Sequence, residues 1–397
     1  MTHPASFPLQ PAPHIRGLAS SLIREVADIG MAQSNVLPFW FGESDQTTPQ
    51  FIREEAIRSL SGGETFYTQN LGRPYLREAI ANYLTNLHER PFSAEQIVAT
   101  NSGVTGLLLA SELLLSPHDK VVIVTPLWPN IGEIPKIFNA NVTRVSLKIH
   151  NNRWALDLEQ LLDALTPDTR ALILNSPNNP TGWTIDDDSV GIILQHCRKH
   201  GIWVISDDVY ERLVHDSALR SAPSFLKQGE PGDRLISVNS FSKAWLMTGW
   251  RAGWMVVPSE LTGDLAKLIE YNTSCMFEPV QRAAVVALHQ GEPEITRQRA
   301  MLTHTRTVLT NALARLPGVE VPDAGGAMYV FFRIAGNTDS VELAKHLVLE
   351  AGLGLAPGAA FGPEGNGWLR WCHAVSDESR LLEGVSRLEK FLENFRP

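Results

Sequence analysis

Residues 171–182 read ALILNSPNNPTG, a short apolar run followed by a turn that holds two prolines and a glycine. Further along, residues 189–200 have the amphipathic pattern of a helix, and a second apolar run follows at residues 201–206. A strand, a helix and a second strand in this order form the unit of a parallel sheet, and strands that are apolar throughout are usually covered on both faces. This stretch therefore predicts an α/β fold with a mostly parallel sheet.

The same alternation extends along the middle of the chain and changes in its last third. There the pattern is helical through residues 281–316, with one break near residues 291–293, and a separate α+β segment follows. We therefore predict a large α/β domain at residues 46–285 and a small domain formed by residues 1–45 together with residues 286–397. The remaining predicted strands cover residues 96–100, 120–125, 235–238, 254–257, 327–334 and 368–373.

The length, charge and cysteine content of the chain narrow the classes of function. A chain of 397 residues is long for a single core, which agrees with two domains. The formal net charge is −9 and no run of lysine and arginine stands out, so a nucleic-acid partner is not expected. No apolar window is long enough to span a membrane, and residues 1–13 lack the pattern of a secretory signal. Three widely spaced cysteines suit a reducing compartment, and we expect a cytoplasmic protein.

Polar residues follow several predicted strands, at the edge where α/β sheets bind ligands. Asn179 lies in the rigid turn after the first apolar run, and Asp207 and Tyr210 follow the next one. Trp128 follows another run, and residues 103–105 open a helix whose free N–H groups suit a phosphate. Each of these residues taken singly is more often part of a turn, a cap or the core. Their joint occurrence after strands predicts a binding site.

Lys243 ends the segment Ser240-Phe241-Ser242-Lys243, just beyond an apolar run, and Arg251 follows within a stretch rich in glycine and tryptophan. An unpaired ammonium in an apolar site is costly, so desolvation or a nearby cation such as Arg251 favours the neutral, nucleophilic amine. The chemistry that needs such a lysine is imine formation with a carbonyl group. The alternative is a lysine that only extends to the surface at the end of a strand.

These residues suit the separate parts of a phosphorylated aromatic aldehyde. The N–H groups of the helix start, the hydroxyls of Ser240 and Ser242 and the guanidinium of Arg251 suit the phosphate. Trp128 offers a flat face to an aromatic ring. Asp207, if buried, needs a cation, and a protonated ring nitrogen supplies one. Asn179 and Tyr210 can form hydrogen bonds to a phenolate oxygen, and Lys243 can hold the aldehyde as an imine.

With these residues assembled, the chain over residues 42–370 resembles the pyridoxal-phosphate enzymes of fold type I, in the class I/II aminotransferase family. The stretch SPNNPTG, the pair Asp207 and Tyr210, and the motif SxSK followed eight residues later by Arg251 carry the resemblance. It implies pyridoxal 5′-phosphate as cofactor, with Lys243 as the Schiff-base lysine and Asp207 as the partner of the ring nitrogen. The other residues that the resemblance assigns to the cofactor are Val104, Thr105, Trp128, Asn179, Tyr210, Ser240, Ser242 and Arg251.

The resemblance also implies a substrate site and a partner subunit. Arg370 matches the arginine that grips the α-carboxylate, a task that suits a guanidinium fork, and Gly42 and Asn179 match residues beside the substrate. Tyr67 resembles the tyrosine that reaches the phosphate of the neighbouring subunit, which implies a homodimer with shared active sites. One segment departs from the family pattern. Residues 103–110 read GVTGLLLA, where many relatives carry a small or polar residue and then Ala-Leu, so the phosphate donor stays open.

Three functions are compatible with these motifs, and we favour the first. It is transamination between an L-amino acid and a 2-oxo acid, in which Lys243 moves the α-proton and Asp207 keeps the ring nitrogen protonated. The second is a lyase on the same scaffold, either a carbon–sulfur β-lyase or a cyclopropane-forming synthase. The third is a sensor with an aminotransferase-like domain, which we disfavour because few residues precede Gly42 to form a DNA-binding domain.

The amino acid that the site accepts stays open. Trp128 resembles the branch of the family that uses aspartate, whereas the aromatic residues 39–41 suit an apolar side chain, unless they only anchor the N-terminal segment. No arginine can be assigned from the sequence to a second, distal carboxylate. A metal site is not expected, because His196 and His200 flank Cys197 on a predicted helix without the glutamate of a HExxH pattern.

Overall fold

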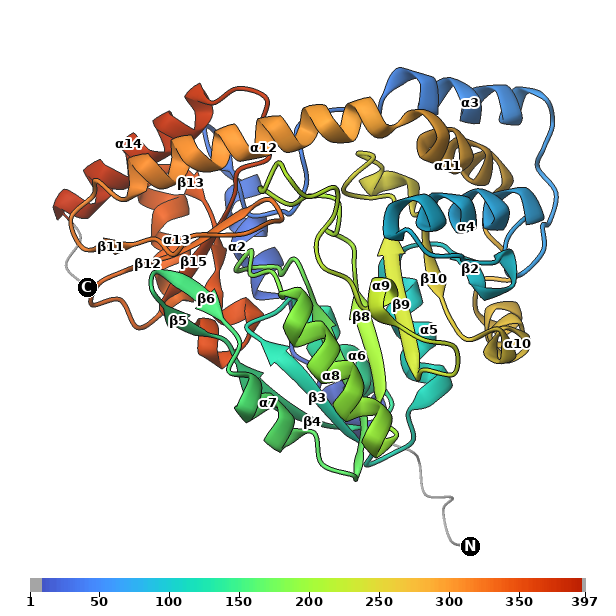
Figure 1. Ribbon diagram of the computed structural model, residues 1–397. Coiled ribbons are helices and arrows are strands. Elements are labelled where there is room, and N and C mark those ends of the chain that lie inside the picture. Colours follow the sequence, from blue (N-terminus) through green and yellow to red (C-terminus); the bar gives the residue numbers. More distant parts are fainter. Residues whose placement is uncertain (1–8, 395–397) are drawn as a thin grey trace, which may run out of the picture.

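A seven-stranded mixed sheet lies at the centre of the computed structural model, which describes residues 9–394 (Figure 1). All neighbouring strands are parallel except β10, which is antiparallel to both of its neighbours, β2 and β9. The predicted α/β fold with a mostly parallel sheet is therefore confirmed. In spatial order the strands are β2 (Ile97–Thr100), β10 (Gly253–Val256), β9 (Leu235–Ser240), β8 (Trp203–Asp207), β7 (Thr169–Asn175), β3 (Lys120–Thr125) and β4 (Asn141–Ser146).

Helices cover both faces of this sheet because its central strands are apolar on both sides. Along β3, Val122 and Val124 pack in one core cluster, whereas Val121 and Ile123 pack in another on the opposite face. On the first face lie α4 (Pro74–His88), α8 (Asp187–His200) and α11 (Glu278–Gln290). On the second face lie α5 (Gly103–Leu114), α6 (Pro129–Ile137) and α10 (Thr262–Asn272).

A second, antiparallel sheet is formed by the C-terminal part of the chain. Its order is β11 (Val319–Glu320), β12 (Tyr329–Ile334), β15 (Trp368–Cys372) and β14 (Ala356–Pro357). The accompanying helices are α12 (Glu292–Leu313), α13 (Ser340–Ala351) and α14 (Ser379–Asn394).

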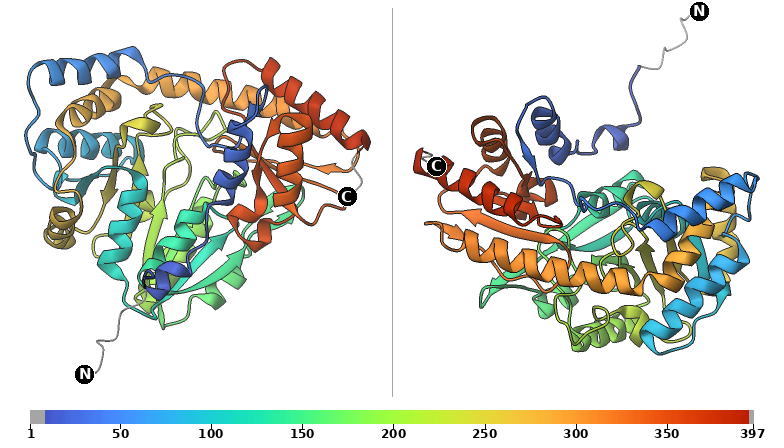
Figure 2. Two further views of the ribbon diagram at one scale, coloured as in Figure 1. Left: turned by 180° about the vertical axis from the view of Figure 1, so that it is seen from behind. Right: turned by 90° about the horizontal axis from the view of Figure 1, so that it is seen from above.

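The N-terminal segment packs against this C-terminal part, as the sequence predicts (Figure 2). Helix α2 (Leu22–Met31) lies against α13, and β1 (Leu37–Pro38) pairs in parallel with β13 (Leu353–Gly354). The rings of Phe39 and Trp371 are 5.1 Å apart between centroids. The exact bounds of the two domains stay a prediction, and residues 1–8 and 395–397 of the small domain lie outside the described residues.

Helix α12 connects the two parts of the molecule through its side chains. Near its start, Gln298 donates a hydrogen bond to the carbonyl of Ala244 at 2.9 Å. Two turns later, Thr305 lies 3.1 Å from Nδ1 of His373, beyond β15. Within residues 9–394 no helix is both long and apolar enough to cross a membrane. The remaining elements are α1 (Pro13–Arg16), α3 (Gln50–Ser61), α7 (Leu158–Ala164), α9 (Phe225–Gln228), β5 (Lys148–His150) and β6 (Arg153–Ala155).

Candidate active site

The register of the large sheet brings three strand ends side by side. Gly253, the first residue of β10, pairs with Ser240 at the end of β9 and with Thr100 at the end of β2. Because β10 runs antiparallel to β9, the loop between them leaves and re-enters the sheet at the same edge. That loop carries Ser242, Lys243 and Arg251, and a cavity of about 400 Å³ opens beside it.

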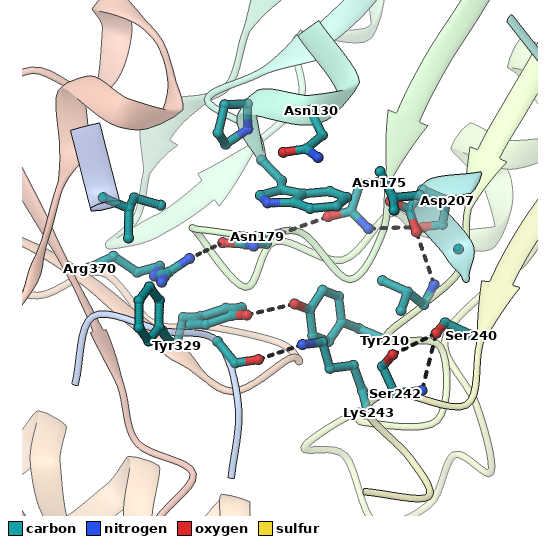
Figure 3. Close-up of a pocket in the computed structure, with 18 of the residues that line it drawn as sticks. Asn130, Asn175, Asn179, Asp207, Tyr210, Ser240, Ser242, Lys243, Tyr329 and Arg370 are labelled. Atoms are coloured by element: carbon teal, nitrogen blue, oxygen red, sulfur yellow. Dashed lines mark hydrogen bonds between the residues drawn. The ribbon is translucent and has the colours of Figure 1, made fainter. Parts of the chain in front are cut away.

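Lys243 reaches into this cavity, and its Nζ donates a hydrogen bond to the carbonyl of Gly42 (Figure 3). Burial lowers the pKa of the Lys243 amine to about 8, because a charged ammonium loses its hydration there. Arg370 and Arg251 lower the pKa further, while Cys372 and Glu43 act in the opposite direction. The interpretation of Lys243 as a surface lysine is therefore wrong, since the side chain lines the cavity.

Asp207 is buried at the end of β8, next to Asn175 at the end of β7. One carboxylate oxygen accepts a hydrogen bond from the amide of Val209 at 3.2 Å, and the Asn175 side chain donates to the backbone carbonyl of Asp207 at 2.9 Å. Burial raises the pKa of the Asp207 carboxyl to about 7. No arginine or lysine of residues 9–394 forms an ion pair with this carboxylate, so the site has room for a cationic group of a ligand.

The other end of the cavity suits a phosphate. Gly103 and Val104 line it at the first turn of α5, where amide groups have no acceptor within the helix. Ser240 donates to the hydroxyl of Ser242 at 2.9 Å, and both residues line the cavity together with Arg251. The amide and hydroxyl of Thr105, by contrast, are hydrogen-bonded to Ser102 Oγ at 3.0 and 2.9 Å, and Thr105 is not among the lining residues, so its predicted contact with the phosphate stays a prediction.

Arg370 enters the same cavity from β15 of the second sheet. One terminal nitrogen donates to the Asn179 side chain at 3.0 Å (Figure 3), and the other donates to the carbonyl of Trp40. The guanidinium lies 4.5 Å from the centre of the Tyr329 ring. Its Nε is buried without a hydrogen-bond partner in the described part of the chain, which leaves a donor for a ligand carboxylate.

Two tyrosines and a glycine fix the space between Lys243 and Arg370. The hydroxyls of Tyr210 and Tyr329 lie 2.6 Å apart, and both residues line the cavity. A Cβ atom on Gly42 would lie 2.0 Å from the Tyr329 hydroxyl, so only glycine fits at this position. The presence of Gly42 is thus explained by close packing against the tyrosine.

The remaining predicted residues are divided between the cavity and the surface. Trp128 lines the cavity with Asn130, in the first turn of α6. Tyr67 does not line it, and its side chain is 88% exposed. Within residues 9–394, no cluster of three His, Cys, Asp or Glu side chains is placed to hold a metal ion.

Several lining residues were not singled out from the sequence. Tyr329 belongs to a predicted strand, but nothing in that strand distinguished an inward-facing tyrosine from a core residue. The N-terminal helix α2 gives no strand-end signal, although its first turn reaches the cavity. The residues in question are Ser21, Ile23, Arg24, Asn130, Asn175, Val209 and Tyr329.

The chemistry of the cavity fits pyridoxal phosphate. An uncompensated buried carboxylate at Asp207 suits a protonated ring nitrogen, and the amine of Lys243 suits a carbonyl carbon. The first turn of α5 with two serines and Arg251 suits a phosphate, and the unpaired Nε of Arg370 suits a carboxylate outside the cofactor.

Comparisons with known proteins agree on one family. The profile of the family described as "Aminotransferase class I and II" matches residues 34–388. An aspartate aminotransferase of Pyrococcus horikoshii is 34% identical over 94% of this chain and 95% of its own length. The structure of an aspartate aminotransferase from Thermotoga maritima superposes with a TM-score of 0.89 at 30% identity, covering 97% of this chain and 100% of the other. An aromatic aminotransferase of Pyrococcus horikoshii superposes with a TM-score of 0.84 at 30% identity, covering 93% and 98%.

Proposed function

This chain belongs to the class I and class II aminotransferase family and is an aminotransferase, and we propose that it transfers the amino group of an L-amino acid to a 2-oxo acid with pyridoxal 5′-phosphate bound in the cavity. The observation that carries the proposal is the amine of Lys243, which lines one cavity together with the buried, unpaired carboxylate of Asp207 and the buried guanidinium of Arg370. The relatives compared above are named aminotransferases, which supports transamination and not the lyase alternative.

The cofactor would be held from three sides. Arg251, Ser240 and Ser242 would bind its phosphate, with the amides at the start of α5. Asp207 would bind the ring nitrogen and keep it protonated, and Trp128 would lie against the ring. Asn179 and Tyr210 would donate hydrogen bonds to the ring oxygen. When bound, pyridoxal phosphate supplies an electron sink for the charge that is left when an α-proton departs.

The substrate would be oriented by Arg370 and Asn179. Arg370 would donate hydrogen bonds to the α-carboxylate from its free Nε and from the terminal nitrogen that now donates to Trp40. The bond of 3.0 Å from Arg370 to Asn179 would fix the plane of the guanidinium. Gly42 allows the Tyr329 hydroxyl to pack where a Cβ atom would otherwise lie.

Lys243 would perform the proton transfers. In its neutral form its Nζ would take the α-proton of the amino acid and return a proton on the other side of the transfer, as base and then as acid. Burial favours that neutral form, because it lowers the pKa of the amine to about 8. Tyr210 lies under this amine, with Nζ 6.0 Å from the ring centre, and thereby limits where the amine can move.

We also propose a homodimer with shared active sites and a cytoplasmic location. Tyr67 and its neighbour Phe66 are 88% and 81% exposed, which is unusual for large aromatic side chains and is typical of an interface. Tyr67 would then contact the phosphate in the partner subunit. The cytoplasmic location agrees with three free cysteines, Cys197, Cys275 and Cys372.

The test is the visible absorbance of the purified protein with pyridoxal phosphate, recorded after separate additions of glutamate, aspartate, alanine, phenylalanine and cysteine. We expect the cofactor band to disappear with an amino donor and to return when a 2-oxo acid is added. Pyruvate release with a persistent band would instead indicate a lyase. The Lys243→Ala protein serves as the control. It should keep the unfolding temperature of the wild type and lose steady-state turnover, and ready turnover by this variant would contradict the role of Lys243.

A further inference from the structure

Tyr329 lines the cavity beside Tyr210, yet the proposed function gives it no task. The hydroxyls of the two tyrosines lie 2.6 Å apart, and within residues 9–394 neither hydroxyl has another hydrogen-bond partner (Figure 3). Tyr329 is fully buried and Tyr210 is almost so. Because buried hydroxyls need hydrogen-bond partners, each of these oxygens depends on the other.

The backbone holds the two tyrosines at this separation. Tyr210 lies in the turn after β8, where its carbonyl accepts from the amide of Leu213 at 2.8 Å. The carbonyl of Leu213 accepts from the amide of Ala327 at 2.8 Å, two residues before Tyr329 at the start of β12. The two rings meet edge to face, with centroids 5.7 Å apart and planes at 78°. The pair is therefore built into the fold.

Two hydroxyl protons compete for the space between the two oxygens. Burial raises the pKa of Tyr329 to about 12 and raises the pKa of Tyr210 well above its ordinary value, so both hydroxyls keep their protons at neutral pH. Only one of these protons can lie between the oxygens. The direction of the other proton depends on which tyrosine is the donor.

The two arrangements differ in what Tyr210 offers to a ligand. If Tyr210 donates to Tyr329, its oxygen presents only lone pairs to the cofactor, and the Tyr329 proton has no acceptor among the described residues. If Tyr329 donates to Tyr210, the Tyr210 proton is free for the ring oxygen of the cofactor, and both protons are used. A donor to the Tyr210 oxygen also makes Tyr210 itself a stronger donor.

The charges around the pair favour Tyr329 as the donor. The guanidinium of Arg370 lies 4.5 Å from the centre of the Tyr329 ring and, against the larger effect of burial, lowers the pKa of Tyr329. Arg370 also lowers the pKa of Tyr210, but the nearby Asp207 carboxylate raises it. The groups that act against Arg370 at Tyr329 are Cys372 and Glu43.

We propose that Tyr329 is a positioning residue, which donates its hydroxyl proton to Tyr210 and thereby directs the Tyr210 proton to the ring oxygen of the cofactor. This inference rests on the proposed function, in which pyridoxal phosphate occupies the cavity with its ring oxygen at Tyr210. That oxygen lies beside the carbon to which Lys243 is joined, and its negative charge attracts a proton on the lysine nitrogen. A strong donor at the oxygen weakens this attraction and lowers the pH at which the nitrogen loses its proton.

The experiment compares wild type with Tyr329→Phe, Tyr210→Phe, the double variant and a matched control, Tyr83→Phe. The Tyr83 hydroxyl accepts from Arg212 at 2.7 Å, and Tyr83 does not line the cavity. The measurement is the visible absorbance of each protein loaded with pyridoxal phosphate, recorded against pH without any substrate. The midpoint of the spectral change reports the protonation of the lysine nitrogen. Unfolding temperatures are recorded for every variant.

We expect Tyr210→Phe to raise the midpoint by about 1–2 pH units, the range of a hydrogen bond to a charged acceptor. Tyr329→Phe should raise it by about 0.2–0.6 pH unit, because one hydrogen bond strengthens the next by roughly 10–30%. In the Tyr210→Phe background, Tyr329→Phe should add nothing, since its effect passes through the Tyr210 hydroxyl. The Tyr83→Phe protein should match wild type.

Two results with these variants would overturn the role of Tyr329. One is an unchanged midpoint in Tyr329→Phe. The other is a shift of equal size with and without the Tyr210 hydroxyl, which would indicate an effect of packing alone.

A second measurement needs no variant, and so it also covers a Tyr329→Phe protein that does not fold. Neutron diffraction of the wild-type protein with pyridoxal phosphate locates both hydroxyl deuterons. We expect the deuteron of Tyr329 between the two oxygens and that of Tyr210 directed at the cofactor, and the opposite order would overturn the proposal. A lyase reaction in place of transamination leaves the role of Tyr329 standing. A protein that binds no pyridoxal phosphate would overturn both this inference and the proposed function.

Discussion

Two buried ionisable groups face the same cavity with pKa values moved toward neutrality. Burial lowers the pKa of Lys243 to about 8 and raises the pKa of Asp207 to about 7, since each group loses hydration when it is charged. Both groups therefore carry less of their charge at neutral pH than they would on the surface. A ligand with a cation beside Asp207 and a carbonyl carbon beside Lys243 gives each group a partner that the surrounding side chains do not provide.

We predict that, in protein without cofactor, the rate at which Lys243 forms an imine increases with pH. The midpoint of this increase should lie near pH 8. Below this pH the amine is protonated and cannot attack a carbonyl, and above it the free amine dominates. The measurement is the initial rate of imine formation with pyridoxal phosphate from neutral to alkaline pH, with Lys243→Ala as the blank. A midpoint close to the ordinary lysine pKa of about 10.4 would show that burial does not activate this amine.

Most individual site residues could be predicted, because a parallel sheet places its ligand at the strand ends. Asn179, Asp207 and Tyr210 follow this rule directly. Arg251 does not, since it precedes a strand, and its closeness to Lys243 in the sequence is what suggested it. Arg24 could not be found at all, because a helix at the start of the chain follows no strand and its distance from the cavity depends on tertiary packing.

At the scale of elements, the direction of β10 is what the sequence could not predict. The apolar run at residues 254–257 indicates a strand but not its orientation. The antiparallel insertion of β10 between β2 and β9 lets a single loop supply Ser242, Lys243 and Arg251 to the same edge. β4 was also missed, because this edge strand is mostly half-buried and lacks an apolar run.

The short segment before the large domain packs tightly against β12, and we predict that Gly42→Ala disturbs both stability and activity. The new methyl group would meet the Tyr329 hydroxyl at 2.0 Å, so the tyrosine must move and its bond of 2.6 Å to Tyr210 must break. Overpacking of this kind typically costs about 1–3 kcal/mol of unfolding free energy. Denaturant unfolding and kcat/KM are the measurements.

Two further variants make the Gly42→Ala prediction specific. Gly263→Ala is the matched control, because a Cβ at Gly263, in the first turn of α10, meets no atom within 4 Å and should lower neither quantity. Adding Tyr329→Phe to Gly42→Ala removes the oxygen that the methyl group meets, and should restore part of the lost stability. A Gly42→Ala protein as stable as wild type would contradict the packing described for this segment.

At the scale of the whole molecule, the site draws on both sheets and on the N-terminal segment. Lys243 lies in the loop after β9 of the large sheet, and Arg370 lies in β15 of the small sheet. Gly42 belongs to the N-terminal segment, which precedes both sheets in the sequence. Large aromatic side chains remain exposed elsewhere, among them Phe66, Tyr67 and Tyr271, the last of which is 89% exposed. The proposed dimer would cover such residues and complete the site with Tyr67.

We predict that two defective subunits restore activity when they are mixed. Lys243→Ala and Tyr67→Ala subunits should each be weakly active or inactive alone. A hybrid dimer contains one site in which Lys243 and the tyrosine supplied from across the interface are both intact, so random exchange should yield about a quarter of the wild-type activity. The measurement is turnover after subunit exchange, with each variant mixed with itself as control. Hybrids that form, as shown by mass, but stay inactive would argue against shared sites.

The carbonyl groups of Trp40 and Gly42 have one further consequence. They already receive hydrogen bonds from Arg370 and Lys243, so the chain itself supplies a solvation shell for two cations that water reaches poorly. Beyond a bond to the free Nε of Arg370, a simple monocarboxylic acid that displaces the Trp40 carbonyl gains only the difference between two similar bonds. An amino acid exchanges at both points together, because its carboxylate and its amine are held at a fixed separation. The two backbone carbonyls thus compete with every ligand for Arg370 and Lys243. A molecule with a single functional group cannot readily displace both of them.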